Sequence, residues 1–153
     1  DQLNYRAVAF SYMKKLRDLI DESVSLYIMT DSKRLCIERV DSKQPLRTNV
    51  SVGDLLPLDK GAAGKLLLAY SGRKCEHPEY QQILRDGYAL SHGEREAGGL
   101  AGIAMPIRDY RGEVCAALSI SGPAHRYTGE RKEQYIQLMR ETVWSISQEI
   151  GCR

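Results

Sequence analysis

The 153-residue sequence lacks the patterns that mark several large classes of protein. Its four cysteines are scattered, with no C-x-x-C pair and no secretory leader beside them, which is typical of a reducing, cytoplasmic setting. The longest apolar runs are far shorter than the roughly 20 residues of a membrane-spanning helix. These absences predict an intracellular domain that has no membrane segment and no disulfide framework.

An excess of charge of one sign is also lacking. The 22 basic residues are nearly balanced by 20 acidic ones, which leaves a net charge of +2. Basic and acidic side chains are mixed within residues 14–18 and 126–133, so no basic stripe for nucleic acid is predicted. We interpret these segments as solvated helix faces.

Motifs for catalysis and for cofactors are missing as well. Gly64-Lys65 is similar to the end of a phosphate-binding loop, but Asp59 stands where that motif needs Gly, and Leu66 where it needs Ser or Thr. A G-x-S-x-G nucleophile motif is absent. The single C-x-H pair at Cys75 offers too few ligands for a metal. We therefore predict no enzyme activity, no cofactor and no metal.

What is present is the composition of one globular domain, with 42% hydrophobic and 27% charged residues. The length predicts a single domain over residues 1–153. The chain lacks an initiator Met and opens directly in a helical pattern. We therefore expect it to be part of a longer protein.

Hydrophobic periodicity predicts the order of the elements. Apolar residues recur every three or four positions over 2–22 and 128–150, which predicts a long helix at each end. Two hairpins are predicted, one over 23–30 and 34–40 and the other over 101–108 and 113–121. Between them we expect a strand at 46–52, helices at 62–70 and 78–85, and a strand at 88–91. This order predicts an α+β domain with a largely antiparallel sheet flanked by helices.

Small residues on two of these strands predict a binding site. Along 113–121 one face is apolar and the other is small and weakly polar, with Cys115, Ala117, Ser119 and Ser121. The strand over 101–108 also alternates with the small residues Gly102, Ala104 and Pro106. Such a face is covered either by a closely packed element, which is the commoner case, or by a ligand. Ser119 and Ser121 add hydroxyls that can donate to one carboxylate or ketone oxygen.

The start of the predicted helix at 62–70 is a second candidate wall. Gly61, Ala62, Ala63 and Gly64 leave its first N–H groups accessible, and the helix dipole favours negative charge there. A carboxylic acid is therefore the ligand class that suits this end. The alternative is a helix start that needs small residues only for packing.

Several stretches in order share one resemblance, which covers nearly the whole chain. They are residues 37–42, 45–47, 53–69, 87–90 with 93–96, 102–109 and 118–123, the last of which reads Leu-Ser-Ile-Ser-Gly-Pro. Together they resemble the effector-binding domain of the IclR family of bacterial transcription regulators. The resemblance implies a GAF-like fold, a small organic-acid effector, and a homodimer or dimer of dimers. It also implies a winged helix-turn-helix domain upstream, through which alone DNA would be bound.

The resemblance also implies the residues of the pocket. It places the backbone of Ala62 and Ala63, beside Gly61, at the carboxylate of the effector, and Ser119 and Ser121 as hydroxyl donors. The remaining positions are the wall residues Ser91 and Gly102 and the apolar cover Leu55 or Leu56. His92, beside Ser91, is a further candidate to pair with the ligand, although a histidine in a surface loop is the commoner case.

Two positions depart from the family pattern. Relatives that sense small oxo acids tend to carry an acidic residue at the position of Ser91 and a cysteine at that of Gly102. The smaller residues here predict a larger or more apolar effector than glyoxylate or pyruvate, such as an aromatic or branched carboxylic acid. Two alternatives stay open, namely a stand-alone GAF-like sensor attached to another output domain, and a small-molecule enzyme that uses His92 or Cys115.

Overall fold

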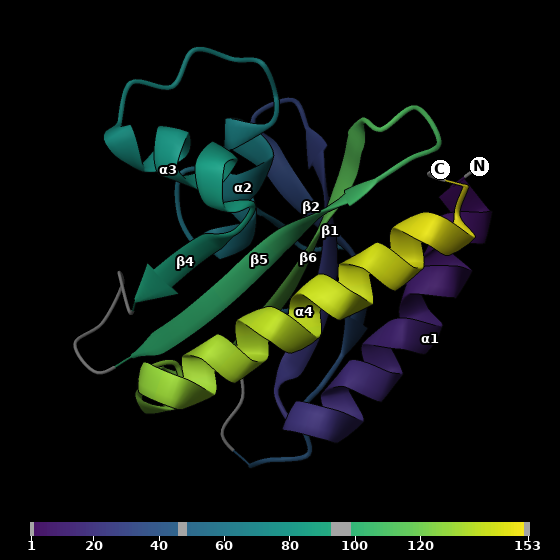
Figure 1. Ribbon diagram of the computed structural model, residues 1–153, viewed down its shortest axis with the longest axis vertical. Coiled ribbons are helices and arrows are strands. Elements are labelled where there is room, and N and C mark those ends of the chain that lie inside the picture. Colours follow the sequence, from purple (N-terminus) through teal and green to yellow (C-terminus); the bar gives the residue numbers. More distant parts are fainter. Residues whose placement is uncertain (1, 46–48, 93–98, 152–153) are drawn as a thin grey trace.

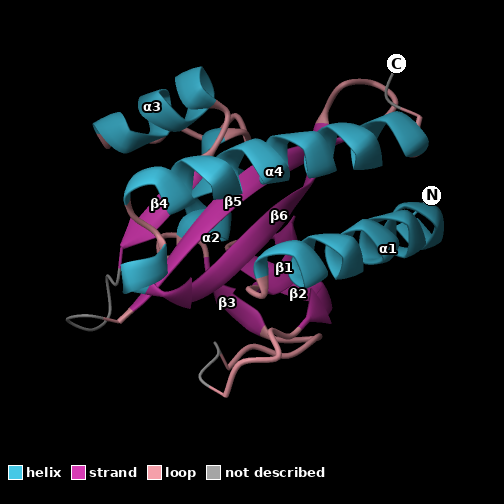
Figure 2. Cartoon of the chain, turned by 60° about the horizontal axis from the view of Figure 1, so that its bottom comes forward, coloured by secondary structure: helices cyan, strands magenta, loops and turns pink. Residues whose placement is uncertain are grey.

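The centre of the computed structural model, which describes residues 2–45, 49–92 and 99–151, is a twisted antiparallel sheet with helices on both faces (Figures 1 and 2). Its strand order is β3-β2-β1-β6-β5-β4. The strands are β1 Ser23–Thr30, β2 Lys33–Val40, β3 Leu55–Pro57, β4 Ala89–His92, β5 Leu100–Arg108 and β6 Val114–Pro123. The helices are α1 Gln2–Ile20, α2 Ala62–Ala69, α3 Pro78–Asp86 and α4 Gly129–Glu149, with a short 3-10 turn η1 at Ala124–Arg126.

The long helices α1 and α4 lie side by side across one face of the sheet (Figure 1). Apolar residues from both helices and from four strands form the larger core there, which we call the helix-side core. Its members with no exposed surface are Ala9, Met13, Val24, Leu26, Ile103, Ile107, Ala116, Leu118, Ile120, Met139 and Ile146. Burying these side chains is the main source of stability, at roughly 1.5–3 kcal/mol for each large one.

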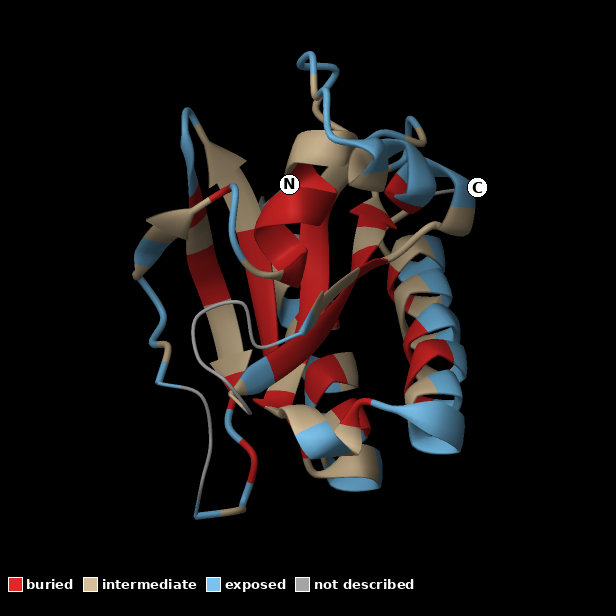
Figure 3. Ribbon diagram, turned by 90° about the vertical axis from the view of Figure 1, so that its left-hand side faces the viewer, coloured by how far each residue is buried: buried red, intermediate tan, exposed pale blue. Residues whose placement is uncertain are grey.

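Helix α2 packs on the opposite face, and α3 packs against α2. The core beneath α2, which we call the α2-side core, is smaller and includes Tyr27, Cys36, Leu66, Ala104 and Ala117. The central strands are therefore buried from both sides, as Figure 3 shows by the run of buried positions along them.

Most of the predicted elements are confirmed, but the strand predicted at 46–52 is wrong. Residues 49–52 form no strand, and 46–48 lie outside the described residues. Pairing with β2 begins only at Gly53, whose N–H donates to the carbonyl of Cys36 at 2.8 Å, while the N–H of Cys36 donates to Asp54 at 3.0 Å. The third strand is therefore the short segment Leu55–Pro57.

The alternation predicted for β6 is confirmed at Ala116, Leu118 and Ile120, which all belong to the helix-side core. It is wrong at Cys115. The register between β5 and β6 shifts after Ile107, which pairs with Ala116 while Arg108 pairs with Val114, and the intervening Cys115 packs against the helix-side core. A bulge of this kind adds one residue to a strand and reverses the alternation locally.

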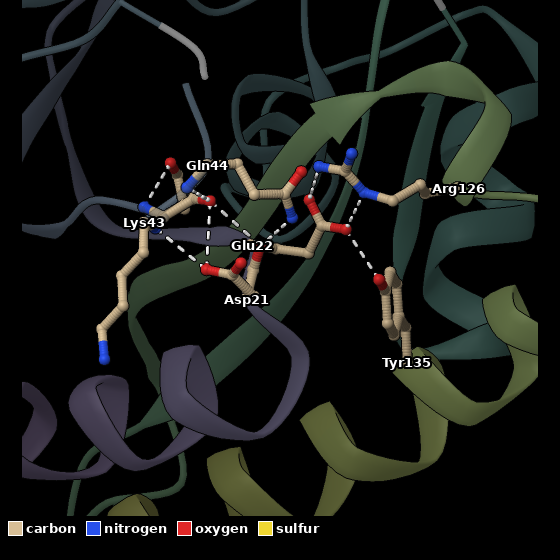
Figure 4. Close-up of polar contacts among 8 residues, drawn as sticks. Asp21, Glu22, Lys43, Gln44, Arg126 and Tyr135 are labelled. Atoms are coloured by element: carbon tan, nitrogen blue, oxygen red, sulfur yellow. Dashed lines mark hydrogen bonds and ion pairs between the residues drawn. The ribbon is translucent and has the colours of Figure 1, made fainter. Parts of the chain in front are cut away.

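A buried ion pair joins η1, which follows β6, to the residue before β1, and a tyrosine of α4 donates a hydrogen bond to it (Figure 4). The carboxylate of Glu22 has no exposed surface and accepts bonds from Arg126 Nε at 2.6 Å and Arg126 Nη2 at 2.8 Å. Tyr135 Oη donates to the same carboxylate at 2.6 Å. A Cβ at Gly122 would collide with this carboxylate, so only glycine leaves room for the pair. The cluster of Glu22, Arg126 and Tyr135 thus ties together elements that are far apart in the sequence.

The neighbouring Asp21 anchors the segment that follows β2 (Figure 4). Its Oδ1 accepts from the N–H of Lys43 at 2.9 Å and from the hydroxyl of Ser42 at 3.2 Å. The amide of Gln44 donates to the carbonyl of Asp21 at 2.7 Å. The N–H of Lys43 is the main cause of a lowered pKa at Asp21. The junction between α1 and β1 is therefore held by two adjacent acidic side chains.

Cys36 is expected to resist alkylation while the domain is folded. Burial raises the pKa of this thiol to about 11, and the side chain has no exposed surface. At about pH 8 the thiolate fraction is then roughly 100-fold lower than for an ordinary cysteine, and reagent access is blocked as well. Mass spectrometry after iodoacetamide treatment should find partly exposed Cys75 labelled and Cys36 unlabelled until guanidinium unfolds the chain. Equal labelling of both cysteines in the folded domain would contradict this burial.

Candidate functional site

The face of the sheet under α2 carries two rows of small residues, which we call the small-residue face. Each row crosses the adjacent strands β4, β5, β6 and β1 in register. The first row consists of Ser91, Gly102, Ser121 and Ser23, and the second of Ala89, Ala104, Ser119 and Ser25. The structure therefore brings Ser91, Gly102, Ser119 and Ser121, four of the predicted site residues, onto one surface.

The start of α2 lies directly over the first row. A Cβ placed on Gly102 would be 3.2 Å from Ser91 Oγ and 3.8 Å from the Cβ of Ala62. It would also be 3.0 Å from the carbonyl oxygen of Ile120, which is tight for a methyl group. Ala62, Ser91 and Gly102 thus converge, as the resemblance implies. The missing side chain at Gly102 leaves little free space, so Gly102 gives little room for a larger effector.

Two hydroxyls at this convergence are available to a ligand. Ser119 is 8% exposed, and its side chain forms no hydrogen bond with any residue that the structure describes. The same is true of the half-buried Ser91 within the described ranges. By contrast, Ser25 Oγ accepts from Arg39 Nη1 at 3.0 Å. Among the described side chains, only the Tyr127 hydroxyl is both fully buried and without a hydrogen-bond partner, so the hydroxyls of Ser119 and Ser91 keep some contact with solvent.

Helix α2 begins without a side-chain cap. Its N-cap is Gly61 at φ 77°, and its first turn carries no acidic residue. Ala62 and Ala63 are 4% and 1% exposed. Gly64, by contrast, is small for packing, because a Cβ there would collide with the backbone of Leu58. Close packing therefore explains the glycine at Gly64, whereas a role of the uncapped helix start in binding an acid stays a prediction.

Two predicted site residues do not join this group. His92 pairs with Ala101, a member of the helix-side core, so it lies on the opposite face from Ser91 and is exposed. Leu55 is 57% exposed on β3. Its neighbour Leu56 packs against the α2-side core and is the leucine suited to be an apolar cover.

Sequence reasoning missed four polar residues of the same face. Ser23 and Ser25 complete the two rows, and Arg34 and Arg39 extend from β2. In residues 23–27, small and apolar side chains alternate at first, and this pattern could have placed both serines on the small-residue face. The arginines carried none, because a basic residue close to a turn usually lies in solvent.

Other site types find no support in the described part of the chain. It contains no group of three or more His, Cys, Asp or Glu side chains that could hold a metal ion. None of its helices is both long and apolar enough to cross a membrane.

Comparison with known families decides the assignment. The sequence model of the family described as "Bacterial transcriptional regulator IclR C-terminal" matches residues 1–81 and 76–148. The chain belongs to the IclR family. The regulator KdgR of Escherichia coli K12 is 30% identical over 162 residues, which cover 91% of this IclR-family domain and 61% of KdgR. The repressor AllR of the same strain is 30% identical over 96% of the domain and 62% of AllR. The domain therefore spans about three-fifths of the length of these relatives, which are transcription regulators rather than enzymes.

Solved structures place the IclR-family domain in the same fold. The C-terminal domain of E. coli KdgR superposes with a TM-score of 0.81 at 27% identity, over 96% of this chain and 98% of that one. An IclR-family regulator from Rhodococcus sp. gives 0.82 at 31% identity, over 92% and 61%. An IclR homologue from Microbacterium hydrocarbonoxydans, complexed with 4-hydroxybenzoate, gives 0.86 at 24% identity, over 99% and 70%. The predicted α+β fold and the family resemblance are confirmed.

Proposed function

We propose that this IclR-family domain binds a small organic acid between the start of α2 and the small-residue face. The observation that carries the proposal is the convergence of Ala62, Ser91 and Gly102 beneath an uncapped helix end. The first N–H groups of α2 suit a carboxylate, since they point out of the helix and the dipole favours negative charge. The hydroxyls of Ser119 and Ser121 suit a second polar group of the same ligand.

The class of acid is the finer part of the proposal. The neutral, half-buried Ser91 offers the ligand a hydroxyl and no charged acceptor. Because Gly102 leaves little space, an effector larger than pyruvate extends along the small-residue face rather than into β5. The Microbacterium homologue holds an aromatic acid, 4-hydroxybenzoate, which makes that compound a useful probe.

The proposed output is a shift between two arrangements of a regulator. We infer a homodimer or dimer of dimers in the cytoplasm, with DNA bound through a winged helix-turn-helix domain outside these residues. An effector changes DNA affinity only as far as its affinity for the two arrangements differs. An acid that binds both arrangements equally leaves transcription unchanged.

A thermal-shift panel tests whether the domain senses acids. The probes are pyruvate, 3-methyl-2-oxobutanoate, benzoate and 4-hydroxybenzoate, each paired with its neutral amide. An acid at a hundred times its dissociation constant adds about 2.7 kcal/mol to the free energy of unfolding. Stabilisation by an acid and not by its amide supports the proposal. Stabilisation by neither would refute an acid effector of these sizes.

Replacing Ser119 with Leu should abolish acid binding while the domain stays folded. Ser119 is flanked in register by Ser25 and Ala104, so a leucine fills the space above the small-residue face. Overpacking should cost about 1–3 kcal/mol of stability. Calorimetric titration with whichever acid stabilises the wild type measures the loss, and Ser119→Ala, which removes one hydroxyl donor without filling the site, should weaken binding but not abolish it. Wild-type affinity in Ser119→Leu would place the ligand elsewhere.

A further inference from the structure

Arg34, near the start of β2, is a buried cation without a counter-charge. The residue is only 8% exposed, and no carboxylate forms an ion pair with it among the residues that the structure describes. Its Nε donates to the carbonyl of Pro57 at 3.1 Å, and its guanidinium lies 4.6 Å from the centroid of the Tyr27 ring. Neither Nη atom has a hydrogen-bond partner within the described ranges. A buried charge of this kind is costly unless it is paired.

The guanidinium is aimed at the start of α2. A Cβ placed on the N-cap residue Gly61 would be 3.1 Å from Arg34 Nη2 and 3.6 Å from its Cζ. The positive end of a helix disfavours a neighbouring cation. Two positive groups therefore meet in a largely buried place, and the N-cap residue Gly61 supplies no side chain to cap the helix end between them. One anion would stabilise both.

We propose that Arg34 binds the carboxylate of the effector jointly with the N-terminus of α2. The inference rests on the proposed function and adds a residue, Arg34, that selects a negatively charged ligand. With Nε committed to Pro57, the two Nη groups remain to donate to carboxylate oxygens, and such charge-assisted bonds are shorter and stronger than neutral ones. The Tyr27 ring holds the guanidinium plane in position. The lack of a side chain at Gly61 lets the acid reach both donors.

This arrangement also sets the direction of the bound acid. Arg34 reaches the helix start from β2, whereas Gly102 and Ser91 meet the same helix start from β5 and β4. The carboxylate accordingly lies toward the β2 side, and the body of the acid extends toward Ser119 and Ser91. Neutral amides and esters are rejected because they leave the guanidinium unpaired.

The test compares Arg34→Met and Arg34→Lys with the wild type. Methionine keeps an apolar chain over Tyr27, and lysine keeps the charge but loses the two-pronged donor geometry. Arg73→Met is the matched control, because Arg73 is exposed and donates to the carbonyl of Asp31, away from this site. For an acid of the panel that binds the wild type, we expect the dissociation constant to rise about 100-fold in Arg34→Met and about 10-fold in Arg34→Lys. It should not change in Arg73→Met. Unchanged affinity in folded Arg34→Met overturns the inference and leaves the proposed function standing.

A second measurement decides the case in which no acid of the panel binds. Sodium formate, the smallest carboxylate, should raise the melting temperature of the wild type more than sodium chloride at equal concentration. It should have no such specific effect on Arg34→Met. This result would support an anion site at Arg34. It would also mean that the effector is an anion whose remaining structure differs from that of the acids in the panel. An equal formate effect on both proteins would overturn the inference.

Discussion

Replacing Arg126 with Ala is expected to lower the free energy of unfolding by about 3–5 kcal/mol, because it leaves a buried carboxylate without its cation. Glu22 has no exposed surface, and after the change Tyr135 remains as its side-chain donor among the described residues. The pKa of Arg126 is raised, chiefly by its hydrogen bonds to Glu22, so the guanidinium that pairs with this carboxylate stays charged. The loss should extend to the junction of α1 and β1, which Glu22 holds.

Denaturant unfolding followed by circular dichroism measures this loss. The exposed pair of Arg111 and Asp109 supplies the control, and Arg111→Ala should cost no more than about 1 kcal/mol. Replacing both Glu22 and Arg126 with Met should recover much of the stability, since the buried carboxylate is then gone as well. If Arg126→Ala unfolded at the same denaturant concentration as Arg111→Ala, the buried pair would not stabilise the fold as expected.

Replacing Gly64 with Ala should destabilise the domain by about 1–3 kcal/mol and weaken acid binding. Inside a helix this change normally stabilises by about 1 kcal/mol, so the expected sign is reversed. A Cβ at Gly64 would stand 2.8 Å from the carbonyl carbon and 2.9 Å from the Cα of Leu58, with the carbonyl oxygen closer still. Backbone atoms on both sides must shift, and the first turn of α2 moves away from Gly102.

The matched control for this change is Ala69→Gly at the other end of α2. It should cost about 1 kcal/mol through helix propensity alone and leave acid affinity unchanged. Unfolding curves give the stability of both variants, and calorimetric titration gives the affinity. A Gly64→Ala variant more stable than the wild type would show that the contact with Leu58 relaxes without cost.

Elements with a strong local pattern were predictable, and those defined by distant partners were not. The two hairpins and the long helices follow from periodicity and turn residues. β3 was misplaced because its position depends on backbone bonds from Gly53 and Asp54 to Cys36, and not on the residues at 46–52. Cys115 was misassigned because alternation alone cannot reveal a bulge.

The candidate site divides in the same way. Small residues mark Gly102 and Ser119 by alternation, and the family resemblance adds Ser91. The burial of Arg34 was not predictable, since it depends on the Tyr27 ring and the start of α2, which lie in other parts of the chain. The sequence shows that Arg34 is charged, but only the structure shows that it is buried.

The pairing at the centre of the sheet has a consequence for how the chain folds. β1 and β6 meet there, with Ser23 opposite Ser121, so the middle of the sheet joins strands from near the two ends of the sequence. Such non-local pairing slows folding, because a long loop must close before the contacts can form. While the chain is being synthesised, the hairpin of β1 and β2 keeps an unpaired apolar edge until β6 leaves the ribosome. An unpaired strand edge of this kind is prone to pairing with other chains, so we expect refolding yield to fall as protein concentration rises.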